Sequence, residues 1–240
     1  AIYSYVNKDG NVYNGSSHGT SCLSLMAGNI PDKYVGTAPL ASYYLCRTED
    51  VKSENIIEEY NWVSAAEFLD SLGIDIISTS LGYVDFDNSQ WDHVYSDLDG
   101  KTSVITIGSE IACSRGILCV TSAGNEGGTA FPYISVPADA ENVLTVGAVD
   151  GNGNRAPFSS VGPTYDNRIK PDVMAHGYGV IVAGSSAGSY YDGSGTSFSC
   201  PVLAGMAACL WQANKHLPAS EIRNVLRQHS SNASNPDNSY

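Results

Sequence analysis

The 240-residue sequence predicts an α/β fold, a three-layer α/β/α sandwich around a mostly parallel sheet. Short β-branched segments bounded by glycine or proline alternate with helical patterns, which is typical of βαβ units. The segment 74–77 is almost continuously apolar, as expected for a strand that helices cover on both faces. The sequence contains no internal repeat, low-complexity tract or linker, so we expect a single domain over residues 1–240.

The strands are expected where β-branched residues cluster between turn-forming residues. Five segments meet this description: 41–46, 74–80, 116–122, 143–149 and 180–183. Because helical patterns separate several of them, we expect these strands to pair in parallel.

Helices are expected between and after these strands. From Trp62 to Leu72, apolar residues recur at spacings of three and four, which predicts a helix that packs on the sheet. A helical stretch follows His18, and residues 196–214 form a long run of small and apolar residues. Ser220 is the expected N-cap of a last helix. The polar tail from Ser230 is expected to be loose.

The composition excludes some functions. The chain has 25 acidic and 12 basic residues, a net charge of −13, which disfavours binding to nucleic acid or to an anionic membrane surface. No apolar run approaches the roughly 18 residues of a membrane-spanning helix.

The cysteines form no C-x-x-C pair, so a zinc site is unsupported, and their pairing stays open. Four of them lie in apolar or small-residue stretches and are expected to be small buried side chains: Cys22, Cys119, Cys200 and Cys209.

Three polar residues are candidates for chemistry, and each also has an ordinary structural explanation. His18 precedes a helix, where a surface histidine is commonly inert. Asn125 follows the strand expected at 116–122, at the sheet edge where α/β proteins bind ligands, although Asn-Glu-Gly also forms ordinary turns. Ser197 opens the long helix after a glycine-rich loop, where its hydroxyl and N–H lie at the positive helix end, yet a capping serine has the same position.

Taken together and in this order, the three motifs resemble those of the subtilisin-like serine proteases, the subtilases. His18-Gly19-Thr20 is similar to the histidine motif of that family, Ser122-Ala123-Gly124-Asn125 to its oxyanion motif, and the segment from Gly195 to Pro201 to its Gly-Thr-Ser-x-x-x-Pro nucleophile motif. The resemblance spans about residues 18 to 229, and flanking motifs agree: Gly36-Thr37-Ala38-Pro39, Ser78-Thr79-Ser80-Leu81-Gly82, Val136-Pro137-Ala138, Val146-Gly147-Ala148, Phe158-Ser159-Ser160 and Lys170-Pro171-Asp172-Val173-Met174-Ala175.

The resemblance implies a serine endopeptidase that works by acyl transfer on polypeptide substrates. Ser197 would be the nucleophile, His18 the general base, and Asn125 an oxyanion donor. Ser80, Leu81 and Gly82 would pair with an extended substrate backbone, and Gly124 would help to form the wall of the pocket for the residue before the scissile bond. Glu126 would favour a cation at the rim of this pocket.

The sequence departs from the family pattern at the catalytic acid. The family places an Asp in an Asp-Ser/Thr-Gly turn well upstream of the histidine, and only seventeen residues precede His18. Asp9 lies in a hairpin-turn sequence and is rejected for this role. We therefore expect a subtilase catalytic domain truncated at both ends, with the acid-bearing strands N-terminal to Ala1 and a closing segment after Tyr240. Residues 1–240 alone would then be poorly active.

Other hydrolase classes do not fit the sequence. An α/β-hydrolase needs G-x-S-x-G and the order Ser, acid, His, which the sequence lacks, and a chymotrypsin-type protease is all-β. A non-catalytic subtilase-like binding or scaffold domain remains the alternative.

The resemblance implies no required cofactor, and it allows structural calcium, although no set of calcium ligands can be read from the sequence. It also implies a secreted or cell-surface protein with its own pro-segment as a partner. No metal ligand is assigned, and four histidines are taken as structural: His93, His176, His216 and His229.

Overall fold

The computed structural model describes residues 2–240. The α-helices are α1 (His18–Ala27), α2 (Ile57–Ser71), α3 (Val104–Ser114), α4 (Thr196–Ala213) and α5 (Ala219–Gln228), and two short 3₁₀ helices are Ser89–Trp91 and Tyr95–Asp97. The strands are β1 (Ile2–Ser4), β2 (Asn29–Ile30), β3 (Tyr34–Val35), β4 (Leu45–Arg47), β5 (Ile76–Thr79), β6 (Leu118–Ser122), β7 (Leu144–Val149), β8 (Val173–His176), β9 (Tyr178–Ala183) and β10 (Tyr190–Ser194).

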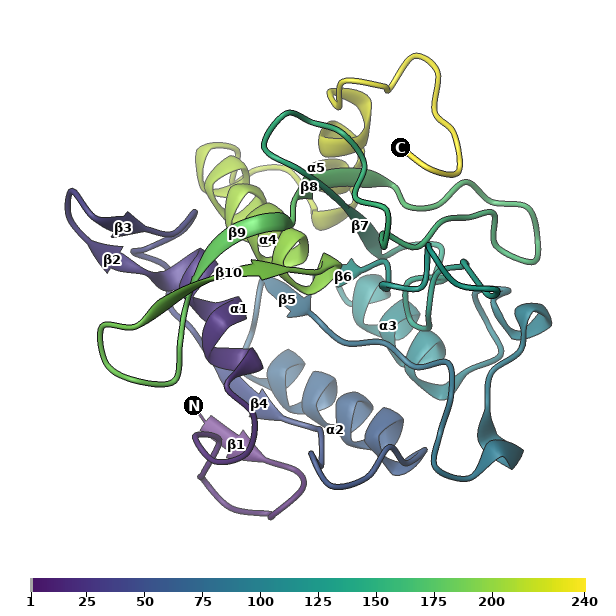
Figure 1. Ribbon diagram of the computed structural model, residues 1–240, viewed down its shortest axis with the longest axis horizontal. Coiled ribbons are helices and arrows are strands. Elements are labelled where there is room, and N and C mark those ends of the chain that lie inside the picture. The colour runs from purple at the N-terminus through teal and green to yellow at the C-terminus, as the bar shows by residue number, and fades with distance from the viewer. Residues whose placement is uncertain (1) are drawn as a thin grey trace.

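The central sheet is parallel and covered by helices on both faces. Its order is β5-β6-β7-β8, with Val120 opposite Leu144 and Val146 opposite Val173. Helices α2 and α3 pack on one face, while α4 and α5 pack on the other, with α1 beside α4 (Figure 1). The expected three-layer α/β/α sandwich is confirmed.

The core lies on both faces of this sheet because neighbouring strand residues point in opposite directions. In β6, Cys119 packs with α2 and α3, whereas Leu118 and Val120 pack with α4 and α5. All five residues of β6 are buried, as expected for a strand between two helical layers.

A second, separate pair of strands lies beside the central sheet. Strand β1 pairs with β4 in parallel, and β4 leads through α2 to β5, but β4 and β5 do not pair with each other. The parallel strands of the chain therefore form two pieces.

The structure corrects the expectation for 180–183. This segment belongs to β9, which pairs antiparallel with β10 in a two-stranded ribbon outside the central sheet. The fourth parallel strand is instead β8, which follows the Lys170–Pro171 segment. Segment 180–183 has three β-branched residues whereas β8 has only Val173, so β-branched composition does not predict which of the two joins the sheet.

Helix α3 was not expected, and two terminal expectations were wrong. The β-branched start of α3 resembles a strand, yet Ser103 caps it by accepting from the Thr106 N–H at 3.2 Å. Helix α5 begins at Ala219, with Pro218 and not Ser220 in the N-cap position. The tail is not loose, since the Asn238 carbonyl accepts from the Gly162 N–H at 2.9 Å.

None of the helices described over residues 2–240 has the length and hydropathy needed to span a membrane.

Candidate active site

The three candidate residues meet at the carboxyl edge of the sheet. His18 is the first residue of α1, Ser197 lies in the first turn of α4, and Asn125 follows β6. All three line one cavity of about 2050 Å³, together with Ser80, Leu81 and Gly82, which follow β5. Gly124 does not line this cavity.

Ser197 is held between α1, α4 and β5 because of a proline one turn later. Pro201 has no N–H to donate to the carbonyl four residues before it, which is that of Ser197. That carbonyl instead accepts from the Ser80 hydroxyl at 2.8 Å and from the Cys22 thiol at 3.3 Å. The half-buried Ser197 hydroxyl donates to the Ser80 carbonyl at 3.3 Å. Its backbone N–H lies in the first helical turn, where N–H groups have no intrahelical acceptor.

The side chain of Asn125 is oriented by the residue before the nucleophile. Its Oδ1 accepts from the Thr196 N–H at 2.9 Å and lies 3.1 Å from the Thr196 hydroxyl. The Gly124 N–H donates to the same hydroxyl at 3.1 Å. Over residues 2–240 the Asn125 Nδ2 group has no hydrogen-bond acceptor, so it is free to donate to a substrate oxygen in the cavity.

The His18 ring borders the cavity without a polar partner that would orient it for catalysis. Its two nitrogens lie 4.0 and 3.8 Å from the Cys22 sulfur, one helical turn away on α1. The ring also packs against Phe198, with centroids 5.9 Å apart. Protein atoms crowd one side of this otherwise exposed residue, and this burial lowers the pKa of His18. Within the described residues, His18 contacts no carboxylate and forms no hydrogen bond with the Ser197 hydroxyl.

Asp9 does not supply that carboxylate. It lies in the expected turn, where the Ser4 N–H donates to its carbonyl at 2.8 Å. The Asp9 side chain accepts from the Asn11 N–H at 3.0 Å, as in an Asx turn.

The backbone after β5 has free hydrogen-bonding groups. Among residues 2–240, no backbone hydrogen bond engages Leu81 or Gly82, and pairing resumes at Tyr83 with Val136. Gly82 lies against Ser135, where an added Cβ would come within 2.2 Å of the hydroxyl oxygen. Gly124 has a φ of 108°, and a Cβ there would come within 2.5 Å of the Glu126 carboxylate. Both positions therefore require glycine.

Sequence reasoning did not assign roles to Thr196, Pro201 and Cys22. Thr196 orients Asn125, and the missing N–H of Pro201 frees the Ser197 carbonyl. The Cys22 thiol donates to that carbonyl and also contacts the His18 ring. The i, i+4 spacing of Cys22 from His18 and of Pro201 from Ser197 was the available signal.

Packing explains three of the cysteines and His93. Cys22, Cys119 and Cys200 are buried as expected, and all six cysteines are free thiols. Cys209 is exposed, contrary to expectation, because its face of α4 lines the cavity. His93 bonds to the buried Glu59 at 2.6 Å, a structural pair.

Three acidic side chains gather at one end of the cavity. Carboxylate oxygens of Glu49, Glu54 and Glu58 all lie within 4.8 Å of one another. Burial and the neighbouring like charges raise the pKa of Glu54 to about 7. Glu58 already accepts from the Asp50 and Asn55 N–H groups, at 2.6 and 3.0 Å, and Glu49 from the Tyr83 hydroxyl at 2.6 Å. Only Glu54 has a carboxylate free of such bonds, so no calcium ligand set is assigned.

We expect Glu54→Gln to flatten the dependence of stability on pH. The pKa of Glu54 is higher in the folded than in the unfolded chain, so ionisation between about pH 4.5 and pH 7 destabilises the fold, and the amide removes this loss. Because Glu54 is exposed, the gain at pH 8 is below about 1 kcal/mol. Urea unfolding at pH 5 and pH 8 measures it. Asp85→Asn is the control, because the exposed Asp85 carboxylate has no hydrogen bond or ion pair within residues 2–240. An equal gain there contradicts the explanation.

Comparisons with known proteins identify relatives of this chain. The sequence model of the subtilase family, peptidase S8, matches residues 1–240. Serine protease AprX of Bacillus subtilis (strain 168) is 32% identical over 250 residues, covering 92% of this chain and 54% of AprX. Subtilisin DY of Bacillus licheniformis is 31% identical, covering 99% of this chain and 77% of its own length. The chain thus spans about half of AprX and three quarters of Subtilisin DY.

A solved structure supports the fold. A cold adapted subtilisin-like serine proteinase superposes with a TM-score of 0.74 at 22% identity, over 98% of this chain and 78% of that chain. By sequence and by fold, this chain belongs to the subtilase family.

Proposed function

We propose that the protein is the catalytic part of a serine endopeptidase. One observation carries the proposal: His18, Asn125 and Ser197, from three separate elements, line one cavity beside an unpaired extended backbone. Membership in the subtilase family supports it.

In the proposed reaction Ser197 attacks the carbonyl carbon of the scissile bond. His18 accepts the hydroxyl proton and then donates it to the leaving amine, so that the amine departs neutral and an acyl-serine remains. Water then attacks the ester by the same route in reverse. Asn125 Nδ2 and the Ser197 N–H donate to the oxyanion of each tetrahedral intermediate.

The substrate is proposed to be an extended polypeptide. The free backbone groups of Leu81 and Gly82 are suited to pair with a substrate strand, which recognises main chain more than side chains. We therefore propose broad sequence preference. An apolar residue is favoured before the scissile bond, and Glu126 favours a cation at the rim.

No cofactor takes part in these steps. Export to the cell exterior, a structural calcium ion and a pro-segment as partner are proposals that rest on the family resemblance alone.

Replacing Asn125 by leucine tests the oxyanion role. We expect kcat for a peptide substrate to fall by about 10² to 10³, the loss of 2.7–4 kcal/mol known for one such donor in a subtilisin, with KM nearly unchanged. The contact forms only with the oxyanion, so substrate binding is not weakened. Steady-state kinetics measure kcat and KM separately. The control is Asn142→Leu, which replaces a surface asparagine outside the cavity. A change in KM alone contradicts the role.

A non-catalytic binding domain is the second candidate. It is favoured by the absence, within the described residues, of a carboxylate at His18 and of a bond between His18 and Ser197. The binding function would be established if the chain binds a peptide and shows no hydrolysis that is lost in the Ser197→Ala variant.

A further inference from the structure

We propose that Cys113 and Cys119 form a thiol pair that a low-molecular-weight disulfide, such as oxidised glutathione, first modifies and then closes into an intramolecular disulfide. Cys113 lies in the last turn of α3, and Cys119 is the second residue of β6. Neither residue lines the cavity that holds Ser197, so this modification site is separate from the candidate active site and does not depend on the proposed function.

A tight turn brings the two cysteines together. The Gly116 N–H donates to the Cys113 carbonyl at 3.0 Å, and Gly116 has a φ of 95°, the left-handed conformation that commonly ends a helix. The Ile117 N–H donates to the Ala112 carbonyl at 3.3 Å. The chain therefore reverses from α3 into β6, and Cys119 runs back along the helix that precedes it (Figure 1).

The side chain of Cys119 faces the side of α3 that carries Cys113. Its sulfur lies 4.0 Å from the Ser109 carbonyl, and Cys113 is one helical turn after Ser109 on the same face. A hydrogen bond joins the two thiols, and both side chains pack in the core between the sheet, α2 and α3. The two sulfurs are therefore neighbours, and a shift of the last helical turn can bring them to the disulfide bond length of about 2.05 Å.

The two thiols differ in burial and in acidity. Cys119 is fully buried, whereas Cys113 is half-buried. The hydrogen bond with Cys119 lowers the pKa of Cys113 more than burial raises it, and the positive charge of Arg223 on α5 also lowers it. The same hydrogen bond, together with burial, raises the pKa of Cys119 well above its ordinary value. Cys113 is thus the thiol that ionises and meets solvent, which is typical of an attacking cysteine beside a resolving one.

The reaction consists of two thiol–disulfide exchanges. The Cys113 thiolate attacks one sulfur of the small disulfide, whose S–S bond breaks: one half leaves as a thiolate, and the other stays on Cys113 as a mixed disulfide. The Cys119 thiol then loses its proton to solvent and attacks the Cys113 sulfur, which releases the second half. The two cysteines lose two electrons, and the reagent is reduced to two thiols. The product ties the end of α3 to β6, the strand that leads to Asn125.

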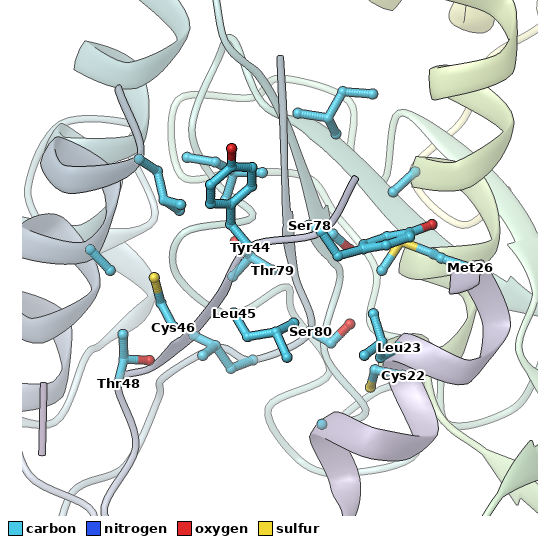
Figure 2. A pocket seen from close by; sticks show the side chains of 18 of the residues that line it. Cys22, Leu23, Met26, Tyr44, Leu45, Cys46, Thr48, Ser78, Thr79 and Ser80 are labelled. Atoms are coloured by element: carbon cyan, nitrogen blue, oxygen red, sulfur yellow. The ribbon is translucent and has the colours of Figure 1, made fainter. Parts of the chain in front are cut away.

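The test treats the purified, folded chain with oxidised glutathione near neutral pH and maps the products by peptide mass spectrometry. We expect a disulfide between Cys113 and Cys119 that dithiothreitol reverses. We also expect Cys113 to react at least tenfold faster than Cys46. Cys46 is the matched control because it is also a half-buried free thiol, but burial raises its pKa. Figure 2 shows Cys46 among the side chains that line the large cavity.

Two variants separate the attacking from the resolving thiol. Cys119→Ala should react more slowly, because the hydrogen bond to Cys113 is lost, and should keep the mixed disulfide on Cys113. Cys113→Ala should leave Cys119 unmodified, because Cys119 is fully buried. Both variants also carry Cys209→Ala, which removes an exposed thiol that reacts on its own. Circular dichroism confirms that each variant is folded.

Three results would overturn the proposal. The first is a pair that stays reduced while Cys46 and Cys209 react. The second is a mixed disulfide on Cys113 that Cys119 does not resolve in the unmodified chain. The third is an equal rate of modification at Cys113 and Cys46. All three are measured on the unmodified chain, so a variant that fails to fold does not affect the test.

Discussion

Ser197→Ala is expected to lower the rate of peptide hydrolysis by this chain by about 10². In a complete subtilisin triad, loss of the serine costs about 2 × 10⁶ in kcat and loss of the acid alone about 3 × 10⁴. These losses do not add because the groups act as a unit. Since His18 contacts no carboxylate within the described residues, most of what Ser197 would contribute is already lost.

Initial rates with a peptide reporter measure this loss. Ser199→Ala is the matched control, since its hydroxyl bonds only to the Thr196 carbonyl, at 2.9 Å, within the same helix. The control should retain full activity. Equal losses in the two variants, or a Ser197→Ala enzyme as fast as the unmodified chain, would contradict the nucleophile assignment.

Asp172→Ala is expected to destabilise the fold by about 3–5 kcal/mol. The Asp172 and Lys170 side chains are 3% and 2% exposed and lie 2.7 Å apart. Asp172 also accepts from the Thr145 N–H at 2.9 Å and lies 3.2 Å from Arg227 of α5. Its removal leaves the Lys170 charge buried without this counterion. It also removes the side chain that links Thr145 of β7 to Arg227 of α5. Urea unfolding monitored by circular dichroism measures the loss.

The double variant Lys170→Met, Asp172→Leu separates charge from packing. Replacing both charges by apolar groups of similar size should recover most of the lost stability, because a buried ion pair is rarely better than good apolar packing. A double variant as unstable as Asp172→Ala would show that the hydrogen bonds of Asp172, and not the unpaired charge, account for the effect.

Much of the central sheet was predictable because its signal is local. The expected segments 74–80, 116–122 and 143–149 became β5, β6 and β7, since each is a short apolar run between turn residues. Helix α4 matched its expected bounds within one residue, because small and apolar residues continue from Thr196 to Ala213. Segment 180–183 is equally apolar but joins β10, since pairing partners depend on contacts distant in sequence.

The candidate residues could be chosen from sequence motifs, but the contacts that hold them could not. His18, Asn125 and Ser197 line one cavity, whereas Gly124 does not line it and donates its N–H to the Thr196 hydroxyl. The Ser197 carbonyl bond to Ser80 joins residues 117 positions apart, and no sequence period reveals such a contact.

The most direct measurement is the position of a covalent adduct formed by a serine-directed fluorophosphonate, read by peptide mass spectrometry. The proposed function predicts one adduct, on Ser197, formed slowly by the chain and absent in the His18→Ala variant. A folded chain that forms no adduct, or one that carries it on a serine outside the cavity, would contradict the proposal that this site performs acyl transfer.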